Sequence, residues 1–474
     1  MTARVAGRVP LAIALGVPTG VLMAAGIARF GDPALVLPLG AVIFLALTLQ
    51  PRVTLALMLC GVVIFEEDSE GFLAFPQFYD ALPGPLGPID VLLFALIAGV
   101  ALRVTSGGET FRTPGLLLLP LLLFAAAVAT GLVTGFAGDP DPAALTGSLR
   151  DLFTLAVLPF LVVNVLTTQR DIQLGLMLLF ALVVYKTATG ATGYVLGIGR
   201  VVEGTVLTYY SPTANLLLLG FVFAVLGAPF SGIRLPKFVW CVAPVALAVL
   251  ILSFRRSFWI ALVIGVVIVV LVATGRRGRA LLIPAGAVLI AAVVFSFTTL
   301  ARTQSDSPVV QRVQSLSPSQ VQTKAYERYR LDEQRNVWAE ITRHPLTGVG
   351  LGVPWRARYP LAITFPGARD YSHAIVLWYW LKLGLIGVLA YIGLISAAVL
   401  SGLALWNRAP DPITRAAGLA LGTSFLVLAV VETTGSFLGV SSRLTAMAAI
   451  VLGGLAAASV QLPPGAPPRA PAAH

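Results

Sequence analysis

The segment ILSFRRSFWIALVIGVVIVVLVATGRRGR, residues 251–279, places a long apolar run between two groups of arginines. The run, residues 258–274, is long enough to cross a bilayer as a helix, for which roughly 17–25 residues are needed. Similar runs recur along most of the chain, and 57% of its 474 residues are hydrophobic while only 11% are charged. The runs are continuous and do not alternate as the strands of a membrane β-barrel do. The sequence therefore predicts an all-α polytopic membrane protein.

The apolar runs predict about 12–14 transmembrane helices. Their expected positions are residues 9–28, 34–49, 53–65, 89–104, 115–136, 152–166, 172–196, 214–226, 238–254, 258–274, 280–297, 384–403, 416–431 and 444–460. The expected parts of the chain are N-terminal transmembrane helices in 1–297, a large extracytoplasmic loop in 298–373, C-terminal transmembrane helices in 374–460 and a disordered tail in 461–474. Within the loop, residues 324–344 have helical character and are followed by a glycine-rich turn.

The distribution of arginines indicates how the chain crosses the membrane. Cytoplasmic loops carry an excess of basic residues, so we expect a cytoplasmic N-terminus. The inner loops then contain Arg52, Arg103, Arg112, Arg170, Arg234, Arg276, Arg277, Arg279, Arg408 and Arg415. The outer loops at residues 66–70, 138–142 and 432–436 are acidic or nearly neutral. Arg255 and Arg256 break this pattern, because their short loop falls on the outer side.

Arg255 and Arg256 are therefore candidates for ligand binding. At an inner loop, two such arginines would be explained by snorkelling, with the guanidinium groups in water and the stems along the helix. At the outer face they oppose the charge bias, and a guanidinium is suited to bidentate binding of phosphate. We expect their ligand to be the diphosphate of a lipid-linked substrate.

The large loop adds a histidine and two arginines to the candidates. His373 lies where the loop returns to the membrane, and it is the candidate general base near this basic outer surface. Arg328 and Arg335 share one edge of the predicted loop helix, beside a stripe formed by Leu331, Gln334, Val337, Trp338 and Ile341. Such a charged edge is more often a solvated face, and Asp332 and Glu333 could pair with its arginines.

Carboxylates of the first outer loop leave a metal site open as an alternative. Glu66 and Glu67 could hold a divalent cation, although adjacent residues need not converge on one ion. The two cysteines, Cys60 and Cys241, lie inside apolar runs, which argues against a disulfide scaffold or a zinc site. Lys186 is a further charge in the middle of a predicted span, and its role stays open.

Three local patterns, taken in order, resemble the O-antigen ligase and O-antigen polymerase superfamily of bacterial membrane glycosyltransferases. SFRRSFWIAL is similar to the family's arginine at the start of a helix and aligns best through Arg256. RNVWAEITRHPLTGVGLG is similar to an arginine, tryptophan and proline-glycine signature in the large outer loop. YSHAIVLWYWLKLGLIGVLAYIG is similar to the histidine that ends this loop. Two positions depart from the family pattern: Ser257 replaces a usual glycine, and Ala374 replaces a common asparagine.

The resemblance implies the reaction and the roles of several residues. Family members transfer a glycan from an undecaprenyl-diphosphate carrier to an acceptor at the outer face of the cytoplasmic membrane. By this resemblance Arg256 and Arg335 bind the diphosphate and His373 is the catalytic base, with no metal or other cofactor. Arg150 and Arg200, both expected at outer helix ends, are lower-ranked candidates for the same ligand. The expected partners are the lipid-linked donor, a glycan, lipid or cell-wall acceptor and the bilayer, without nucleic acid.

Two other functions remain open from the sequence. One is a metal-dependent glycosyltransferase that uses the acidic outer loops, and the other is a polysaccharide or lipid transporter. A transporter would be expected to show paired charges within its spans or an internal repeat, and no repeat is visible in the sequence.

Overall fold

A computed structural model describes residues 36–66, 74–79, 87–107, 110–198, 201–202, 205–209, 211–274, 325–361, 363 and 369–463. The predicted spans 9–28 and 280–297, the residues Glu67 and Arg200, and most of the predicted tail lie outside these ranges. The described part contains nine helices long and apolar enough to cross a membrane, or ten if one bent pair counts as a span. The prediction of an all-α polytopic membrane protein is thereby confirmed.

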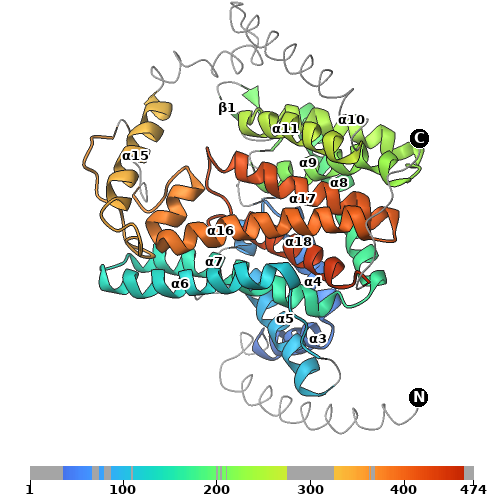
Figure 1. The fold of residues 1–474 in the computed structure, drawn as a ribbon, viewed down its shortest axis with the longest axis horizontal. Helices are drawn as coiled ribbons and strands as arrows, with labels where there is room; N and C mark the ends of the chain where they lie inside the picture. The colour runs from blue at the N-terminus through green and yellow to red at the C-terminus, as the bar shows by residue number, and fades with distance from the viewer. Residues whose placement is uncertain are drawn as a thin grey trace, which may run out of the picture.

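The elements follow one another along the chain as a helical bundle (Figure 1). They are α3 (Val36–Leu49), α4 (Pro51–Ile64), η2 (Pro76–Phe78), α5 (Pro88–Thr105), η3 (Gly115–Leu117), α6 (Leu118–Ala137), α7 (Pro142–Val165), α8 (Gln169–Leu196), the short strands β1 (Val201–Val202) and β2 (Thr205–Val206), α9 (Pro212–Ser231), α10 (Lys237–Ile251), α11 (Arg256–Ala273), α15 (Ala325–Ile341), α16 (Ile375–Arg408), α17 (Pro412–Val431) and α18 (Ser442–Val460). In Figure 1, α6, α16, α17 and α11 run side by side across the view, and α15 lies at one end of them.

Several helix boundaries differ from the sequence prediction, for local reasons. α7 begins at Pro142, ten residues before the start of the predicted span 152–166. The reason is local, because Pro142 occupies the first helical position and the Asp141 side chain caps the Ala144 amide. α16 begins at Ile375 rather than at 384, and Gly384 breaks its regular conformation with φ 69°. α3 and α4 are bent by 111° at the Gln50–Pro51 junction, so the two predicted spans form a bent pair.

Small residues allow the central helices to approach closely. α16 packs along α17, and an added Cβ at Gly402 would lie only 2.5 Å from the carbonyl oxygen of Gly418. At the third glycine of this contact, Gly422, an added Cβ would lie 3.2 Å from the Cα of Gly402. Close contact between backbones is a main source of helix association in a bilayer, where lipid chains are as apolar as leucine. These glycines therefore fix the distance between α16 and α17.

The glycine-rich turn after α15 anchors the large loop to the bundle. The Leu351 amide donates to the Gly131 carbonyl oxygen in α6 at 2.8 Å, and the Val349 amide donates to Leu381 in α16 at 2.7 Å. Gly350 has φ 96°, and an added Cβ there would lie 2.2 Å from the backbone nitrogen of Gly135. Only glycine meets both conditions. The turn is thus a packing element inserted between α6 and α16.

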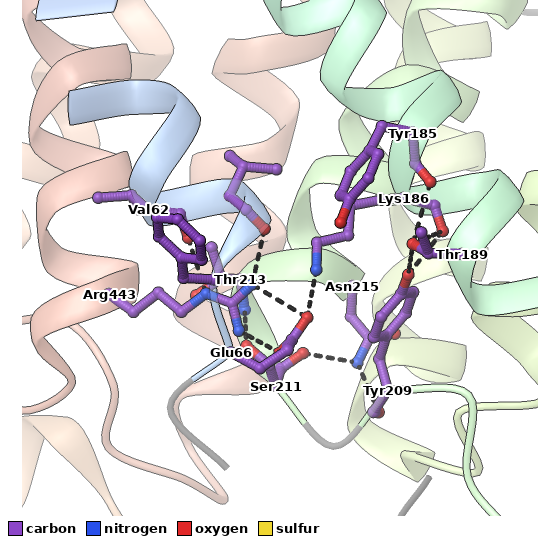
Figure 2. A network of polar contacts seen from close by, with 12 residues as sticks. Val62, Glu66, Tyr185, Lys186, Thr189, Tyr209, Ser211, Thr213, Asn215 and Arg443 are labelled. Carbon is purple, nitrogen blue, oxygen red and sulfur yellow. Dashed lines mark hydrogen bonds and ion pairs between the residues drawn. The ribbon is translucent and has the colours of Figure 1, made fainter. Parts of the chain in front are cut away.

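A buried ion cluster joins three helices that are distant in sequence. Glu66, just after α4, is ion-paired with Lys186 of α8 and with Arg443 of α18, and all three residues are at most 4% exposed. Figure 2 shows Lys186 and Arg443 on opposite sides of the Glu66 carboxylate. Arg443 also donates to the carbonyl oxygens of Val62 and Val63, and the Lys186 ammonium lies 4.9 Å from the centre of the Tyr209 ring.

The electrostatic balance of the cluster depends on Glu66. Burial would raise the pKa of this carboxyl group, but the nearby charges of Arg443 and then Lys186 hold its pKa below the ordinary value. Glu66 is therefore ionised and neutralises one of the two cations. Both carboxylate oxygens of Glu66 accept from Arg443 or Lys186, so these two cations hold the positions that a metal ion at Glu66 would need.

We predict that Glu66→Ala destabilises the protein much more than Lys186→Met. The first change leaves two cations buried without a counter-ion, which costs about 3–5 kcal/mol. The second leaves the Glu66–Arg443 pair intact in apolar surroundings and is close to neutral. Thermal unfolding of the purified variants in detergent measures the difference. Equal losses of stability, or no gain when Lys186→Met is added to Glu66→Ala, would contradict this account.

Candidate functional site

His373 forms a close pair with a carboxylate of the loop helix. Its Nδ1 lies 2.6 Å from Glu333 Oε2, and its backbone amide donates to Glu333 Oε1 at 2.6 Å. Glu333 is fully buried and His373 is 8% exposed. A proton on Nδ1, shared with this carboxylate, leaves the lone pair of the neutral ring on Nε2. The arrangement gives the ring one tautomer and one orientation, as a general base requires.

Glu333 comes to His373 because of how α15 is seated. Asn336, on the same helix, accepts hydrogen bonds from the Arg358 and Tyr359 amides at 2.6 and 2.8 Å. The buried face of α15 consists of Tyr329, Glu333, Asn336, Val337, Glu340 and Ile341. This corrects the predicted stripe, of which Leu331 is 42% and Trp338 49% exposed. The polar pairs of Glu333 and Asn336, together with the packing of Val337 and Ile341 on Trp355 and Leu381, decide which side faces the protein.

Aromatic rings close around the His373 imidazole. The ring centres of Tyr371 and Tyr329 lie 4.9 and 5.9 Å from that of His373, both edge to face. Trp355 is buried, and its indole nitrogen donates to the Tyr371 carbonyl oxygen at 3.0 Å. These contacts restrict the movement of His373, so that the site is held by packing as well as by the Glu333 pair.

The segment between α17 and α18, residues 432–441, supports this site from the other side. The Ser436 hydroxyl donates to the Ser372 carbonyl oxygen at 2.5 Å, and the Tyr371 hydroxyl donates to the Ser436 carbonyl oxygen at 3.2 Å. The Ile375 amide donates to the Glu432 carbonyl oxygen at 3.0 Å. The 432–441 segment therefore contacts the chain on both sides of His373.

The same segment contacts the arginine hairpin. The guanidinium carbon of Arg255 lies 5.7 Å from the centre of the Phe437 ring, which is next to Ser436 in the chain. Arg255 ends a tight connection between α10 and α11, in which Phe254 adopts the left-handed conformation with φ 51°. Arg256 is the first residue of α11 and is partly buried. Arg255 and the chain around His373 therefore both contact the 432–441 segment, although 118 positions separate Arg255 from His373 in sequence.

The loop arginines lie on the outside of α15. Arg335 is 70% exposed, and its Nη1 lies 3.7 Å from Asp332. Residues two apart on a helix do not share a face, so Arg335 points away from the face that carries Glu333. Arg328 is also exposed. The prediction that nearby carboxylates pair with the arginines of this helix is confirmed for Asp332, which lies close to Arg335. It is wrong for Glu333, because the Glu333 carboxylate pairs with His373.

Arg150 takes part in an ion pair within the protein. Its Nε lies 2.7 Å from Asp90 Oδ1, and its Nη1 donates to the Tyr79 carbonyl oxygen at 2.5 Å. The pair joins α7 to α5 and reduces the capacity of Arg150 to bind an added anion. Arg200 lies outside the described residues. Nowhere in the described part of the chain do three His, Cys, Asp or Glu side chains gather as for a metal ion.

Three features escaped sequence reasoning. Glu333 stands among the charges of α15 and carries no motif, and the 432–441 segment reads as a short polar loop. Sequence reasoning gives Arg443 no role. The available signal was its position at the start of an apolar run, since Lys186 within a span and Glu66 at an outer helix end are charges that could pair with it. All three depend on contacts between residues at least 40 positions apart, as in the Glu333–His373 pair.

Comparison with known families places this site in context. Residues 241–392 match the family described as O-antigen ligase, which confirms the resemblance drawn from the sequence. The match includes the hairpin with Arg255 and Arg256, the helix α15 and His373. No curated protein matches the chain.

Proposed function

We propose that this membrane protein transfers a glycan from an undecaprenyl-diphosphate carrier to an acceptor sugar at the outer face of the cytoplasmic membrane. The observation that carries the proposal is the His373–Glu333 pair, which lies inside the segment similar to O-antigen ligases. The similarity supports a glycosyltransferase of the membrane with a lipid-linked donor. The specific carrier, the base and the arginine ligands are our inference.

In the proposed mechanism, His373 acts on the acceptor. Nε2 takes the proton of an acceptor hydroxyl, and the oxygen of that hydroxyl attacks the anomeric carbon of the donor sugar. Glu333 accepts the Nδ1 hydrogen bond and stabilises the positive charge that develops on the ring. The bond from the anomeric carbon to the carrier diphosphate breaks, and its electron pair leaves with the diphosphate. Glu333 is a positioning residue, because it acts through His373.

Arginines stabilise the leaving group in this scheme. The carrier diphosphate gains negative charge as the glycosidic bond breaks, and fixed guanidinium groups stabilise that charge. Arg256 and Arg335 are the proposed ligands, supported by Arg255 and with Arg328, Arg150 and Arg200 ranked below them. Arg335 is accessible to an added ligand, whereas the Arg150 guanidinium is paired with Asp90.

The geometry favours this function over both alternatives. The metal-dependent transferase relies on the acidic outer loops, and Glu66 is already neutralised by Lys186 and Arg443. The transporter relies on charges within the spans for a translocation path. The mid-span charge of Lys186 belongs to the same cluster, which is buried away from solvent and in which Glu66 is held by both cations. A histidine base oriented by a carboxylate is instead suited to chemistry at the outer end of the bundle.

We expect His373→Ala to abolish transfer, with a loss of roughly 100- to 10,000-fold. The assay incubates the purified protein with an undecaprenyl-diphosphate oligosaccharide and an acceptor glycan, and resolves the products by size. A ladder of products indicates a polymerase, and a single shifted acceptor indicates a ligase. If the wild-type protein releases no carrier diphosphate, or if His373→Ala transfers glycan as the wild type does, the proposal fails.

Glu333→Gln tests the positioning role. An amide keeps the size of the side chain but can donate to Nδ1, which selects the wrong tautomer, so kcat falls roughly 100-fold or more. KM for the donor should stay near that of the wild type, and Glu333→Asp should restore part of kcat. A rise in KM with unchanged kcat would show that Glu333 serves only the shape of the loop.

Arg256→Ala and Arg335→Ala test the diphosphate ligands. Loss of a charge-assisted hydrogen bond should raise the donor KM roughly 10- to 100-fold. Lysine at either position should rescue only part of the loss, because it lacks the bidentate guanidinium. Arg408→Ala is the matched control, since Arg408 is exposed at the opposite end of α16 from His373. Equal effects of Arg408→Ala would attribute the change to general surface charge.

A further inference from the structure

A hollow lies at the end of the bundle opposite to His373. It has a volume of about 290 Å³ and lies between α4, α8, α17 and α18. The course of α17 shows that the cavity and His373 lie at opposite ends of the bundle. The first turn of α17 lines the cavity at Thr414. Its last residue is followed by Glu432, whose carbonyl oxygen accepts from the amide of Ile375, two residues after His373. The cavity wall is apolar and includes Leu55, Leu59, Leu179, Leu421, Ile450 and Leu455. Water gains no hydrogen bonds from such a wall, so a hydrocarbon ligand fits it better.

The depth of the cavity matches one leaflet of a bilayer. Its lining extends along α4 from Arg52 to Leu59 and along α8 from Asp171 to Leu179. At a rise of 1.5 Å per residue these stretches span roughly 10–12 Å. Half of a hydrocarbon core that is about 30 Å thick is slightly more. A helix with side chains is about 10–12 Å wide and would not fit this volume, whereas a single lipid chain would.

Two glycines keep the cavity open. Gly175 of α8 and Gly454 of α18 line it, and a Cβ added at either would meet no atom within 4 Å. This differs from the glycines between α16 and α17, where the neighbouring backbone fills the space. Gly175 and Gly454 therefore do not serve contact between helices, and their effect is to leave room for a ligand.

The mouth of the cavity is basic. Arg52 lines it with its side chain 53% exposed, and Arg170, the residue before Asp171, is also exposed. Two carboxylates lie at this end. Asp171 is used by Arg52 at 3.0 Å and by the Thr168 amide and hydroxyl at 3.0 and 2.8 Å, and Asp411 accepts from the amide and hydroxyl of the lining residue Thr414 at 3.0 and 2.8 Å. Arg112, which donates to the Thr167 carbonyl oxygen, is a third arginine at this end, so the arginines outnumber the carboxylates and the charge favours an anion.

From these observations we infer that the cavity is a binding site for an anionic phospholipid of the leaflet opposite His373. One acyl chain fills the apolar space between α4, α8, α17 and α18, and the phosphate lies at Arg52 and Arg170. By the orientation expected from the loop charges this is the cytoplasmic leaflet. The bound lipid joins four helices below the Glu66 cluster and stabilises their packing.

The test measures lipid bound to the full-length protein in detergent. Dipalmitoyl-phosphatidylglycerol and dipalmitoyl-phosphatidylcholine are added separately, and retained lipid is counted by mass spectrometry alongside thermal unfolding. Wild type should retain the anionic lipid selectively and unfold at higher temperature with it. Gly175→Leu and Gly454→Leu each displace at least two methylene groups of the chain, so retention should fall roughly tenfold. Arg52→Gln with Arg170→Gln should remove the preference for the anionic head group.

Gly40→Leu is the matched control, because Gly40 is an exposed helix glycine with open space that does not line the cavity. It should retain lipid as the wild type does. The proposal is overturned if both leucine variants bind lipid normally, if phosphatidylcholine is retained equally, or if both variants fail to fold, since chain atoms would then fill the space. His373→Ala should bind lipid normally, which separates this result from the proposed transfer activity.

Discussion

The carboxylate of Glu66, enclosed between two cations, is the interaction on which the rest of the structure depends. Removing three charges from water is costly, and the cost is offset only while Glu66 stays paired with the buried cations. The cluster therefore sets the positions of α4, α8 and α18 relative to one another at the end of the bundle where the candidate site lies. Because Arg443 lies two residues after the end of the 432–441 segment, this constraint also fixes where that segment contacts the His373 loop and Arg255.

Composition was sufficient to predict the class of fold and most of its helices, because a bilayer demands long apolar runs. It was not sufficient for their ends. The start of α7 depends on the Asp141 cap and on Pro142, which add helix outside the apolar run. The 111° bend at Pro51 makes a bent pair of two runs that were expected as separate spans. Caps and bends are local backbone chemistry, which a count of apolar residues does not record.

The candidate site was predictable in part. His373, Arg255 and Arg256 were recognised because each is a polar exception in an apolar setting, and the sequence pattern around them is shared with O-antigen ligases. Glu333 was not, because one carboxylate in a helix rich in charges has no distinguishing neighbour in sequence. Only the seating of α15, with Asn336 bound to the Arg358 and Tyr359 amides, shows which of its acidic residues is buried. Arg335 lies on the exposed side of that helix, where its guanidinium is accessible.

The position of the 432–441 segment has a consequence for biosynthesis. Ribosomes deliver a chain from its N-terminus, so α11, α15 and His373 are made before Ser436, Phe437 and Arg443 exist. Until then the His373 loop lacks its contact with Ser436, and Glu66 is neutralised by Lys186 alone. The contacts of Arg255 and of the His373 loop with the 432–441 segment can therefore form only after that segment and α18 have been made. A partly synthesised chain thus has every residue proposed to contact the donor and lacks the support that holds them in place.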